Sequence, residues 1–188
     1  MQTLTRGALT VACTFTLGAG LAHPAHAQAS PSGVRGEILA QFDDAVNKIL
    51  QLAEAIPQDK YGWRPAAGVR SISEVFMHVA GGNYYVLTFA GVQAPAGMSE
   101  TMETAVTDRA QVMDQLKRSI EHVRAAIRAT ADADLDKPTT MFGQPATIRG
   151  VLLLGATHAH EHLGQLIAYA RSNGVVPPWS RAGGGGGK

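Results

Sequence analysis

Residues 157–166 read THAHEHLGQL and place three histidines and a glutamate within one stretch that has the periodicity of a helix. On a helix of 3.6 residues per turn, His158 and His162 project from the same face. His160 lies roughly 200° from each of them around the helix axis, so we interpret it as an exposed bystander. Two imidazoles on an inward face need polar partners, or each costs several kcal/mol of desolvation. One cation satisfies both, so the spacing predicts a pair of metal ligands.

The same residues also fit the H-x-x-E-H pattern of inverzincin proteases, in which Glu161 is the general base. Proteases of that class take a third ligand from a glutamate further along the chain, and here no Asp or Glu follows Glu161. We therefore set the protease interpretation aside. Glu161 remains a candidate base or outer partner of the metal site. The alternative is a surface carboxylate near Arg149 or Arg171.

A third ligand must come from another part of the chain, where His78 and His122 are the candidates. His122 stands among charged residues, which favours a solvated side chain. His78 lies on an apolar face and is followed one turn later by Gly81 and Gly82, whose lack of side chains allows a second helix or a ligand to come close. Alone, His78 would suit a core histidine. Combined with the inward pair, it completes a three-imidazole set, which is typical of catalytic zinc.

Three further residues are candidates for the surroundings of this site. Gln165, one turn after His162, would orient that ring. Tyr85 lies two turns from His78 on the same face and would donate to an oxygen on the metal, unless it is simply a core tyrosine. Trp63 precedes this helix and would either line the mouth of the pocket or plug the end of the helical domain.

Four segments carry helical periodicity. They span Ile38 to Ile56, Ser71 to about Val92, about Thr107 to Thr130, and the stretch from after Thr147 to near Ser172. The second begins with a Ser71–Glu74 capping box, and the fourth ends at Asn173-Gly174. Strand character is confined to a short hairpin over 138–146 with Gly143 at its turn. Four helices of about 20 residues or more predict an all-α fold, a four-helix bundle whose connections are long enough for a crossover.

The ends of the chain predict export. Residues 1–27 have the charged start, the short apolar run and the Ala-x-Ala site of a cleaved signal peptide. The run is too short to span a bilayer, and a lipoprotein anchor at Cys13 would leave hardly any apolar run before it. Cleavage after Ala27 leaves 188 − 27 = 161 residues, with a bundle domain at 28–180 and a disordered glycine-rich tail at 181–188. We expect a periplasmic or secreted location.

The composition of the mature chain excludes several functions. Cys13 is the only cysteine and leaves with the signal, so no disulfide and no protein thiolate is available. Fifteen basic and fifteen acidic residues follow position 27, which gives a formal charge of 15 − 15 = 0. Because no basic run stands out either, we expect no binding to nucleic acid. No later segment predicts a membrane span.

Two segments together resemble the DinB-like superfamily, and the similarity extends over essentially all of the mature chain. They are YGWRPAAGVRSISEVFMHVAGGN (61–83) and HAHEHLGQLIAYARSNGVVPPW (158–179). The resemblance implies an up-down-down-up four-helix bundle, often a homodimer. It also implies a divalent metal, usually zinc or nickel, on one histidine of the second helix and two of the fourth. In this chain those positions are His78, His158 and His162.

The characterised relatives implied by this resemblance include bacillithiol and mycothiol S-transferases and a thiol-dependent maleylpyruvate isomerase. Such thiols are mainly cytoplasmic, and the export signal therefore argues against thiol transfer. Our leading hypothesis is an exported metal-dependent hydrolase or transferase that acts on an unknown small molecule, with hydrolysis fitting export slightly better. The alternatives are a non-catalytic module that binds metal or a small ligand, and a bundle whose histidines are structural.

Overall fold

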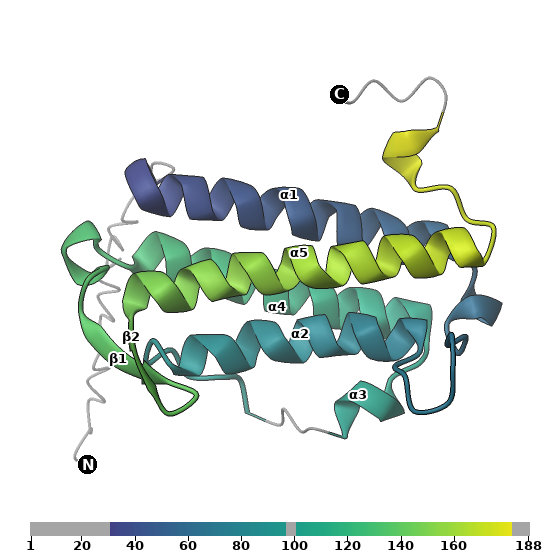
Figure 1. The fold of residues 1–188 in the computed structure, drawn as a ribbon, viewed down its shortest axis with the longest axis horizontal. Helices are drawn as coiled ribbons and strands as arrows, with labels where there is room; N and C mark the ends of the chain where they lie inside the picture. Colours follow the sequence, from purple (N-terminus) through teal and green to yellow (C-terminus); the bar gives the residue numbers. More distant parts are fainter. Residues whose placement is uncertain (1–30, 97–100, 182–188) are drawn as a thin grey trace, which may run out of the picture.

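The computed structural model describes residues 31–96 and 101–181, and four long helices dominate it (Figure 1). These are α1 (Gly33–Ala55), α2 (Ile72–Thr88), α4 (Arg109–Ala129) and α5 (Ile148–Ser172). A one-turn helix, α3 (Met102–Ala105), precedes α4, and a hairpin of β1 (Pro138–Met141) and β2 (Gln144–Thr147) precedes α5. Single turns of 3-10 helix follow α1, α4 and α5, at Gln58–Lys60, Asp132–Asp134 and Pro178–Ser180.

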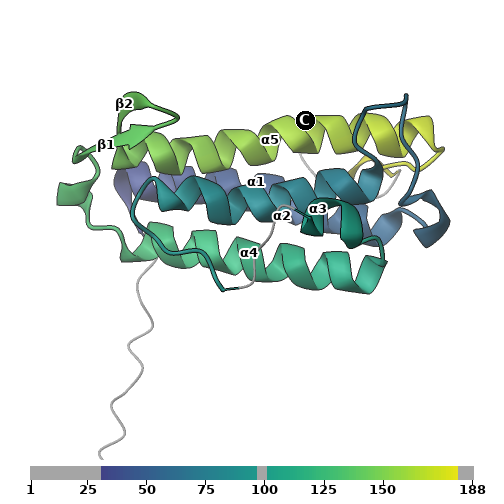
Figure 2. The same ribbon diagram turned by 90° about the horizontal axis from the view of Figure 1, so that it is seen from below.

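The four long helices close into a ring, in which α1 and α2 each pack against both α4 and α5 (Figure 2). Following the colour from start to end, α1 and α5 run in one direction and α2 and α4 in the other. The all-α fold is therefore confirmed, and the four long helices of the structure follow an up-down-down-up order. Because α2 and α4 are parallel neighbours, the chain between them must return along the bundle, and this crossover carries α3.

The apolar periodicity predicted the inward faces of α1 and α4 correctly. Every position of these two stripes is at most 5% exposed: Ile38, Phe42, Ala45, Ile49, Leu52 and Ile56 in the first, and Val112, Leu116, Ile120, Val123 and Ile127 in the second. Burying a side chain of this size contributes roughly 1.5–3 kcal/mol, so these stripes hold the bundle together. α1 begins at Gly33, before its expected start at Ile38. Its first turn is mostly solvent-exposed and carries no apolar pattern, so helical periodicity did not mark it.

The start of α2 agrees with the prediction, whereas its end does not. The Ser71 hydroxyl accepts from the Glu74 backbone amide at 3.3 Å, and the Glu74 carboxylate accepts from the Ser71 amide at 2.7 Å. The helix ends at Thr88 after 17 residues, short of the expected Val92. Gly91 takes a left-handed φ of 78°, and the Val92 amide donates back to the Leu87 carbonyl. Val92 thus packs on the core after the helix has ended.

The predicted hairpin over 138–146 is present and is attached to α2. Its strands are antiparallel, with Met141 opposite Gln144, and the two turn residues Phe142 and Gly143 have φ values of 52° and 76°. Positive φ at both positions suits the right-handed twist of a two-residue hairpin. The Thr139 hydroxyl donates to the Phe89 carbonyl at 2.6 Å, which fixes the hairpin against the end of α2.

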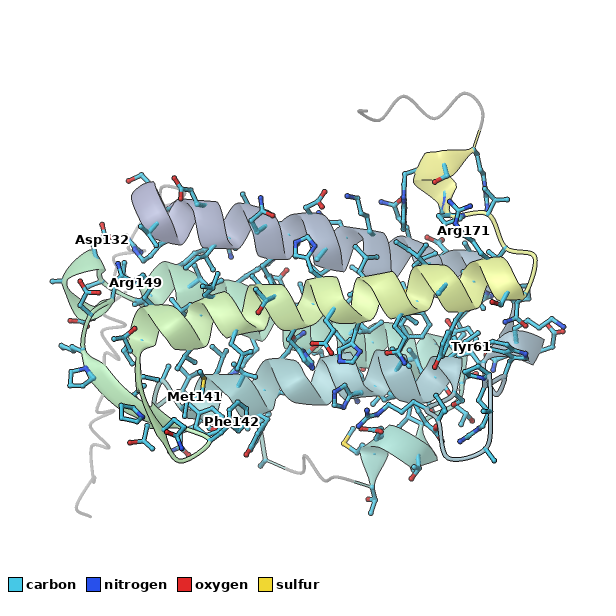
Figure 3. All side chains as sticks on the ribbon, viewed as in Figure 1. Tyr61, Asp132, Met141, Phe142, Arg149 and Arg171 are labelled. Carbon is cyan, nitrogen blue, oxygen red and sulfur yellow. The ribbon has the colours of Figure 1, made fainter. Side chains whose placement is uncertain are left out.

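The opposite end of the bundle is closed by the connection between α1 and α2 (Figure 3). The buried Tyr61 hydroxyl donates to the Ala53 carbonyl in the last turn of α1. Backbone bonds from Ile72 to Trp63 and from Ser73 to Tyr61 fix this connection to the start of α2. The predicted signal peptide and residues 182–188 of the predicted tail lie outside the described residues. Within the described residues, no helix has both the length and the apolarity to cross a bilayer.

Candidate metal centre

Three histidines meet where α2 and α5 pack against each other. His78 lies in the middle of α2, and His158 and His162 lie one turn apart on α5; one nitrogen from each ring lies within 4.8 Å of the others. The Nε2 atoms of His78 and His158 are 3.2 Å apart. Two ligands at 2.0–2.1 Å from one tetrahedral zinc ion would be separated by about 3.3–3.4 Å. The group could therefore hold a metal ion.

Two of the rings make a hydrogen bond on their outer side, which leaves the lone pair of the inner nitrogen free to bind a metal ion. His78 Nδ1 is 3.1 Å from the Glu103 carboxylate, and His162 Nδ1 is 2.9 Å from the Gln165 side-chain oxygen. Both partners are acceptors, so each Nδ1 carries the proton and each Nε2 keeps its lone pair. The Gln165 amide nitrogen donates to the Tyr169 hydroxyl at 3.0 Å, which fixes the amide orientation. Such outer bonds orient histidine ligands in metal sites.

The surroundings keep two of the imidazoles neutral at pH 7. Burial, assisted by the neighbouring histidines and by Arg70, lowers the pKa of His158 to about 4. Burial and then the Arg70 charge also lower the pKa of His78, although the Glu103 hydrogen bond opposes this shift. The His162 side chain is buried and the His78 side chain is 27% exposed. Protons therefore compete little for the nitrogens of His158 and His78 at neutral pH.

The two glycines after His78 differ in function. A Cβ atom on Gly82 would overlap the ring carbon Cε1 of His158 and would lie 3.1 Å from its Nδ1, whereas a Cβ on Gly81 would meet nothing within 4 Å. The His158 ring therefore lies directly on the backbone of α2, one turn from His78. Of the predicted glycine pair, only Gly82 is required for the close approach of the helices.

Comparison with known proteins places the chain in a family. Residues 41–166, which include all three histidines, match the sequence model of the DinB superfamily. The chain belongs to the DinB superfamily. It is 26% identical over 141 residues to the uncharacterized protein YjoA of Bacillus subtilis (strain 168), a match that covers 73% of this chain and 90% of YjoA.

Solved structures of DinB-like proteins have the same fold. The crystal structure of a DinB-like protein from Bacillus cereus ATCC 10987 has a TM-score of 0.63 at 18% identity and covers 75% of this chain and 93% of that one. The crystal structure of Bacillus subtilis YjoA has a TM-score of 0.58 at 25% identity, with coverages of 74% and 93%. The helical fold of this chain is therefore similar to the folds of these DinB-like proteins.

The other predicted site residues of this DinB protein lie at different distances from the cluster. Trp63 packs edge-on against the Tyr169 ring with centroids 5.3 Å apart, so it reaches His162 only through Tyr169 and Gln165. Glu161 is exposed on α5. Tyr85 is not brought to the histidines: it is 57% exposed and its ring contacts Phe89 and Phe142.

One residue beside the histidine cluster, Glu103, was not predicted from the sequence. Glu103 lies in the four-residue helix α3, where neither periodicity nor a motif marks it. Burial acts to raise the pKa of its carboxyl group, but the hydrogen bonds from Arg70 and His78 outweigh burial, and the pKa is lowered. An ionised carboxylate therefore lies against the outer side of His78. Only the packing of the crossover on α2 places it there.

The two remaining histidines lie away from the cluster. His160 Nε2 is 3.0 Å from the Gln41 carbonyl of α1. The prediction of a solvated His122 was wrong: its ring lies 5.1 Å from that of Tyr84, and its Nε2 is buried with no hydrogen-bond partner among the described residues. Of its charged neighbours, Arg124 is paired with Asp43 of α1 and with Glu121, so charge nearby in the sequence did not indicate solvent at the His122 ring. Burial lowers the pKa of His122.

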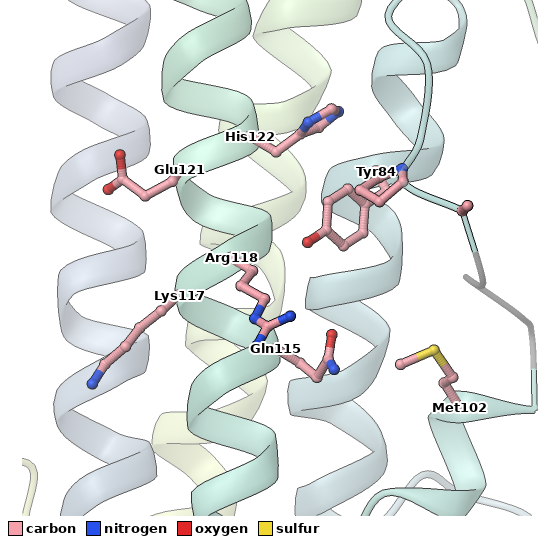
Figure 4. A pocket seen from close by; sticks show the side chains of 9 residues that line it. Tyr84, Met102, Gln115, Lys117, Arg118, Glu121 and His122 are labelled. Atoms are coloured by element: carbon pink, nitrogen blue, oxygen red, sulfur yellow. The ribbon is translucent and has the colours of Figure 1, made fainter. Parts of the chain in front are cut away.

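His122 and Tyr84 line a hollow of about 710 Å³ between α2, α4 and the crossover (Figure 4). Its other lining residues are Pro95, Ala96, Met102, Gln115, Lys117, Arg118 and Glu121. A second hollow, of about 770 Å³, lies between α1 and α4. Neither hollow is lined by the three clustered histidines, so chemistry rather than cavity size identifies the candidate site.

Proposed function

We propose that this DinB protein is exported, binds one divalent metal ion through His78, His158 and His162, and uses it in a hydrolase- or transferase-type reaction. The observation that carries the proposal is the 3.2 Å separation of the His78 and His158 Nε2 atoms, together with the acceptors on the outer nitrogens of His78 and His162. Three imidazole nitrogen ligands suit zinc- or nickel-class ions better than magnesium or calcium, which prefer oxygen.

The arrangement of the residues supports a reactive site over a purely structural one. Three protein ligands leave coordination positions open, which is the pattern of catalytic zinc sites. The His78 side chain is 27% exposed, so the cluster is not sealed from solvent. Bound here, the ion would supply Lewis acidity and make a water molecule or a substrate thiol nucleophilic near neutral pH. The protein's own contribution is to orient the imidazoles and to hold them close together.

The second candidate is a module that binds metal or a small ligand without catalysis. It is favoured by the state of the carboxylates, because a metal-assisted reaction commonly needs a base nearby. Glu103 is already bound by Arg70 and His78, and Glu161 is exposed on α5. The two candidates share the metal site and differ only in whether a chemical step follows binding.

Metal content tests the shared part of the proposal. Protein produced without a histidine tag should contain about one zinc or nickel ion per chain by elemental analysis, and His158→Ala should lose most of it. Adding zinc to chelator-treated protein should raise its melting temperature, since a ligand at 100 times its dissociation constant stabilises by about 2.7 kcal/mol. His160→Ala is the control and should keep its metal. Wild-type protein with neither metal nor zinc-dependent stabilisation would refute the site.

An activity screen separates the enzyme from the binder. Metal-loaded protein should be tested against esters, amides and thiol-conjugated electrophiles, with His162→Ala beside it. Turnover that the variant loses supports catalysis. Stoichiometric metal without turnover on any of these classes supports the binding module.

Export is tested on the natural host or on a bacterium that expresses the full chain. Cell fractionation followed by N-terminal sequencing should find the protein outside the cytoplasm, beginning at Gln28. A cytoplasmic protein that still begins at residue 1 would refute export and would restore thiol transfer as the better candidate reaction.

A further inference from the structure

The crossover between α2 and α4 contributes a carboxylate to the histidine cluster. α3 packs against α2 in the lower part of Figure 1. From it, Glu103 places Oε2 3.1 Å from His78 Nδ1 and Oε1 2.6 Å from Arg70 Nε. Arg70 Nη2 makes a longer contact of 3.5 Å with Oε2. The carboxylate is thus held between the guanidinium of Arg70 and the imidazole of His78.

The chemistry of this arrangement determines which nitrogen of His78 carries the proton. A neutral imidazole has one N–H and one lone pair, and an ionised carboxylate can only accept. Hydrogen bonding to Glu103 therefore requires the proton on Nδ1 and directs the Nε2 lone pair toward His158 and His162. The opposite tautomer would direct a proton into the position of the ion and leave the carboxylate without its imidazole donor.

We propose that Glu103, held by Arg70, is a positioning residue that fixes the tautomer and the ring orientation of His78, and thereby sets the affinity of the three-histidine site for metal. The inference rests on the proposed metal site. It also gives the crossover a function, because Arg70 lies immediately before the capping residue of α2, whereas Glu103 is 33 residues further along the chain. Removing an outer hydrogen-bond partner of a histidine ligand typically weakens metal binding 10- to 100-fold.

The first test measures the tautomer in the metal-free protein, where binding has no influence. Long-range ¹H–¹⁵N NMR of the histidine rings should show His78 with its proton on Nδ1 in the wild type. In Glu103→Ala the Nε2–H form should appear. In Glu103→Gln the single amide oxygen is taken by Arg70 and the amide NH2 faces His78 Nδ1, so the Nε2–H form should appear there as well. A His78 ring that keeps the proton on Nδ1 in Glu103→Ala would overturn the inference.

The second test measures zinc affinity by competition with a chromophoric chelator. Glu103→Ala and Glu103→Gln should each bind zinc 10- to 100-fold more weakly than the wild type, and Arg70→Met several-fold more weakly. The matched control is Glu54→Gln, an exposed carboxylate on α1, which should change the affinity less than twofold. Equal affinities for wild type and Glu103→Ala would overturn the inference.

The two tests also separate this inference from the proposed function. If the wild type binds no zinc, the metal site fails, and the tautomer measurement still decides the role of Glu103. Far-ultraviolet circular dichroism establishes that each variant is folded. Because Glu103 is only part-buried on a single-turn helix, the bundle should fold without it. If Glu103→Ala does not fold, Glu103→Gln and Arg70→Met decide the question, and unchanged tautomer and affinity in both would overturn the inference.

Discussion

The His158 ring of α5 occupies the space where a side chain at position 82 of α2 would lie. Glycine inside a helix costs roughly 0.5–1 kcal/mol relative to alanine. At Gly82 the missing side chain lets the His158 ring approach α2, so that His158 Nε2 lies 3.2 Å from His78 Nε2. At Gly81 no ring fills the space. Alanine substitutions at the two adjacent glycines can therefore be compared directly.

Gly82→Ala should displace the His158 ring and weaken zinc binding by at least tenfold. The reason is steric, because the new methyl group would overlap Cε1 of the ring. Gly81→Ala is the control: its Cβ would meet open space, so zinc affinity should stay within twofold and the melting temperature should rise slightly. Zinc competition and thermal denaturation of both variants check this. Equal zinc affinities in the two variants would contradict the geometry.

Gln165 should orient His162 through its side-chain oxygen. Gln165→Met removes the acceptor on His162 Nδ1 and should lower zinc affinity by about tenfold. Gln165→Glu keeps an acceptor and should retain the affinity of the wild type or exceed it, since a charged acceptor makes a stronger bond. The same chelator competition measures both. A glutamate variant as weak as the methionine variant would mean that packing, and not hydrogen bonding, is what Gln165 supplies.

The metal-free protein should lose stability as the pH falls from about 6.5 to about 4. The pKa of His158 is 6.5 in the unfolded chain and about 4 in the folded one. Between these values the unfolded state binds a proton that the folded state excludes. The contribution of His158 to the free energy of unfolding is fully present above pH 6.5 and is lost as the pH falls toward 4. The slope should remain below the roughly 1.4 kcal/mol per pH unit of one whole proton, because the ring is part-exposed.

Urea unfolding of wild type and His158→Gln across this range isolates the effect from the carboxylates that titrate in both proteins. The free energy of unfolding of the variant should decline less steeply between pH 6.5 and 4. Parallel profiles would show that His158 is protonated as easily in the folded protein as in the unfolded chain.

Tyr61→Phe should destabilise the bundle without affecting the metal site. The phenol donates to the Ala53 carbonyl at the end of α1, and its loss leaves a buried acceptor unpaired, at a cost of about 1–2 kcal/mol. Tyr61 lies at the end of the bundle opposite the hairpin (Figure 3), so zinc stoichiometry should not change. Tyr85→Phe, at a 57% exposed position, should shift the unfolding free energy by less than about 0.5 kcal/mol. Chemical denaturation compares the two, and a larger loss for Tyr85→Phe would contradict this account.

Much of the fold could be predicted because its determinants are local. The apolar spacing in α1 and α4, the Ser71–Glu74 capping box and the hairpin turn at Gly143 each depend on backbone geometry within a few residues. The same rule places His158 and His162 on one face of α5. The end of α2 was predicted too late because the apolar residue at Val92 continues the pattern after Gly91 has already turned the chain.

Relationships between helices could not be obtained in this way. The meeting of His78 with His158, across 80 residues, depends on how far α2 and α5 slide and rotate against each other. The contact of Glu103 with His78 depends on the path of the crossover. The turn of Tyr85 toward Phe142 depends on where the hairpin docks. The sequence by itself determined the helices and the chemistry that each one carries, because helical periodicity is a local property. Only the tertiary structure decided which of those groups meet, because the packing of distant segments sets their offset and rotation.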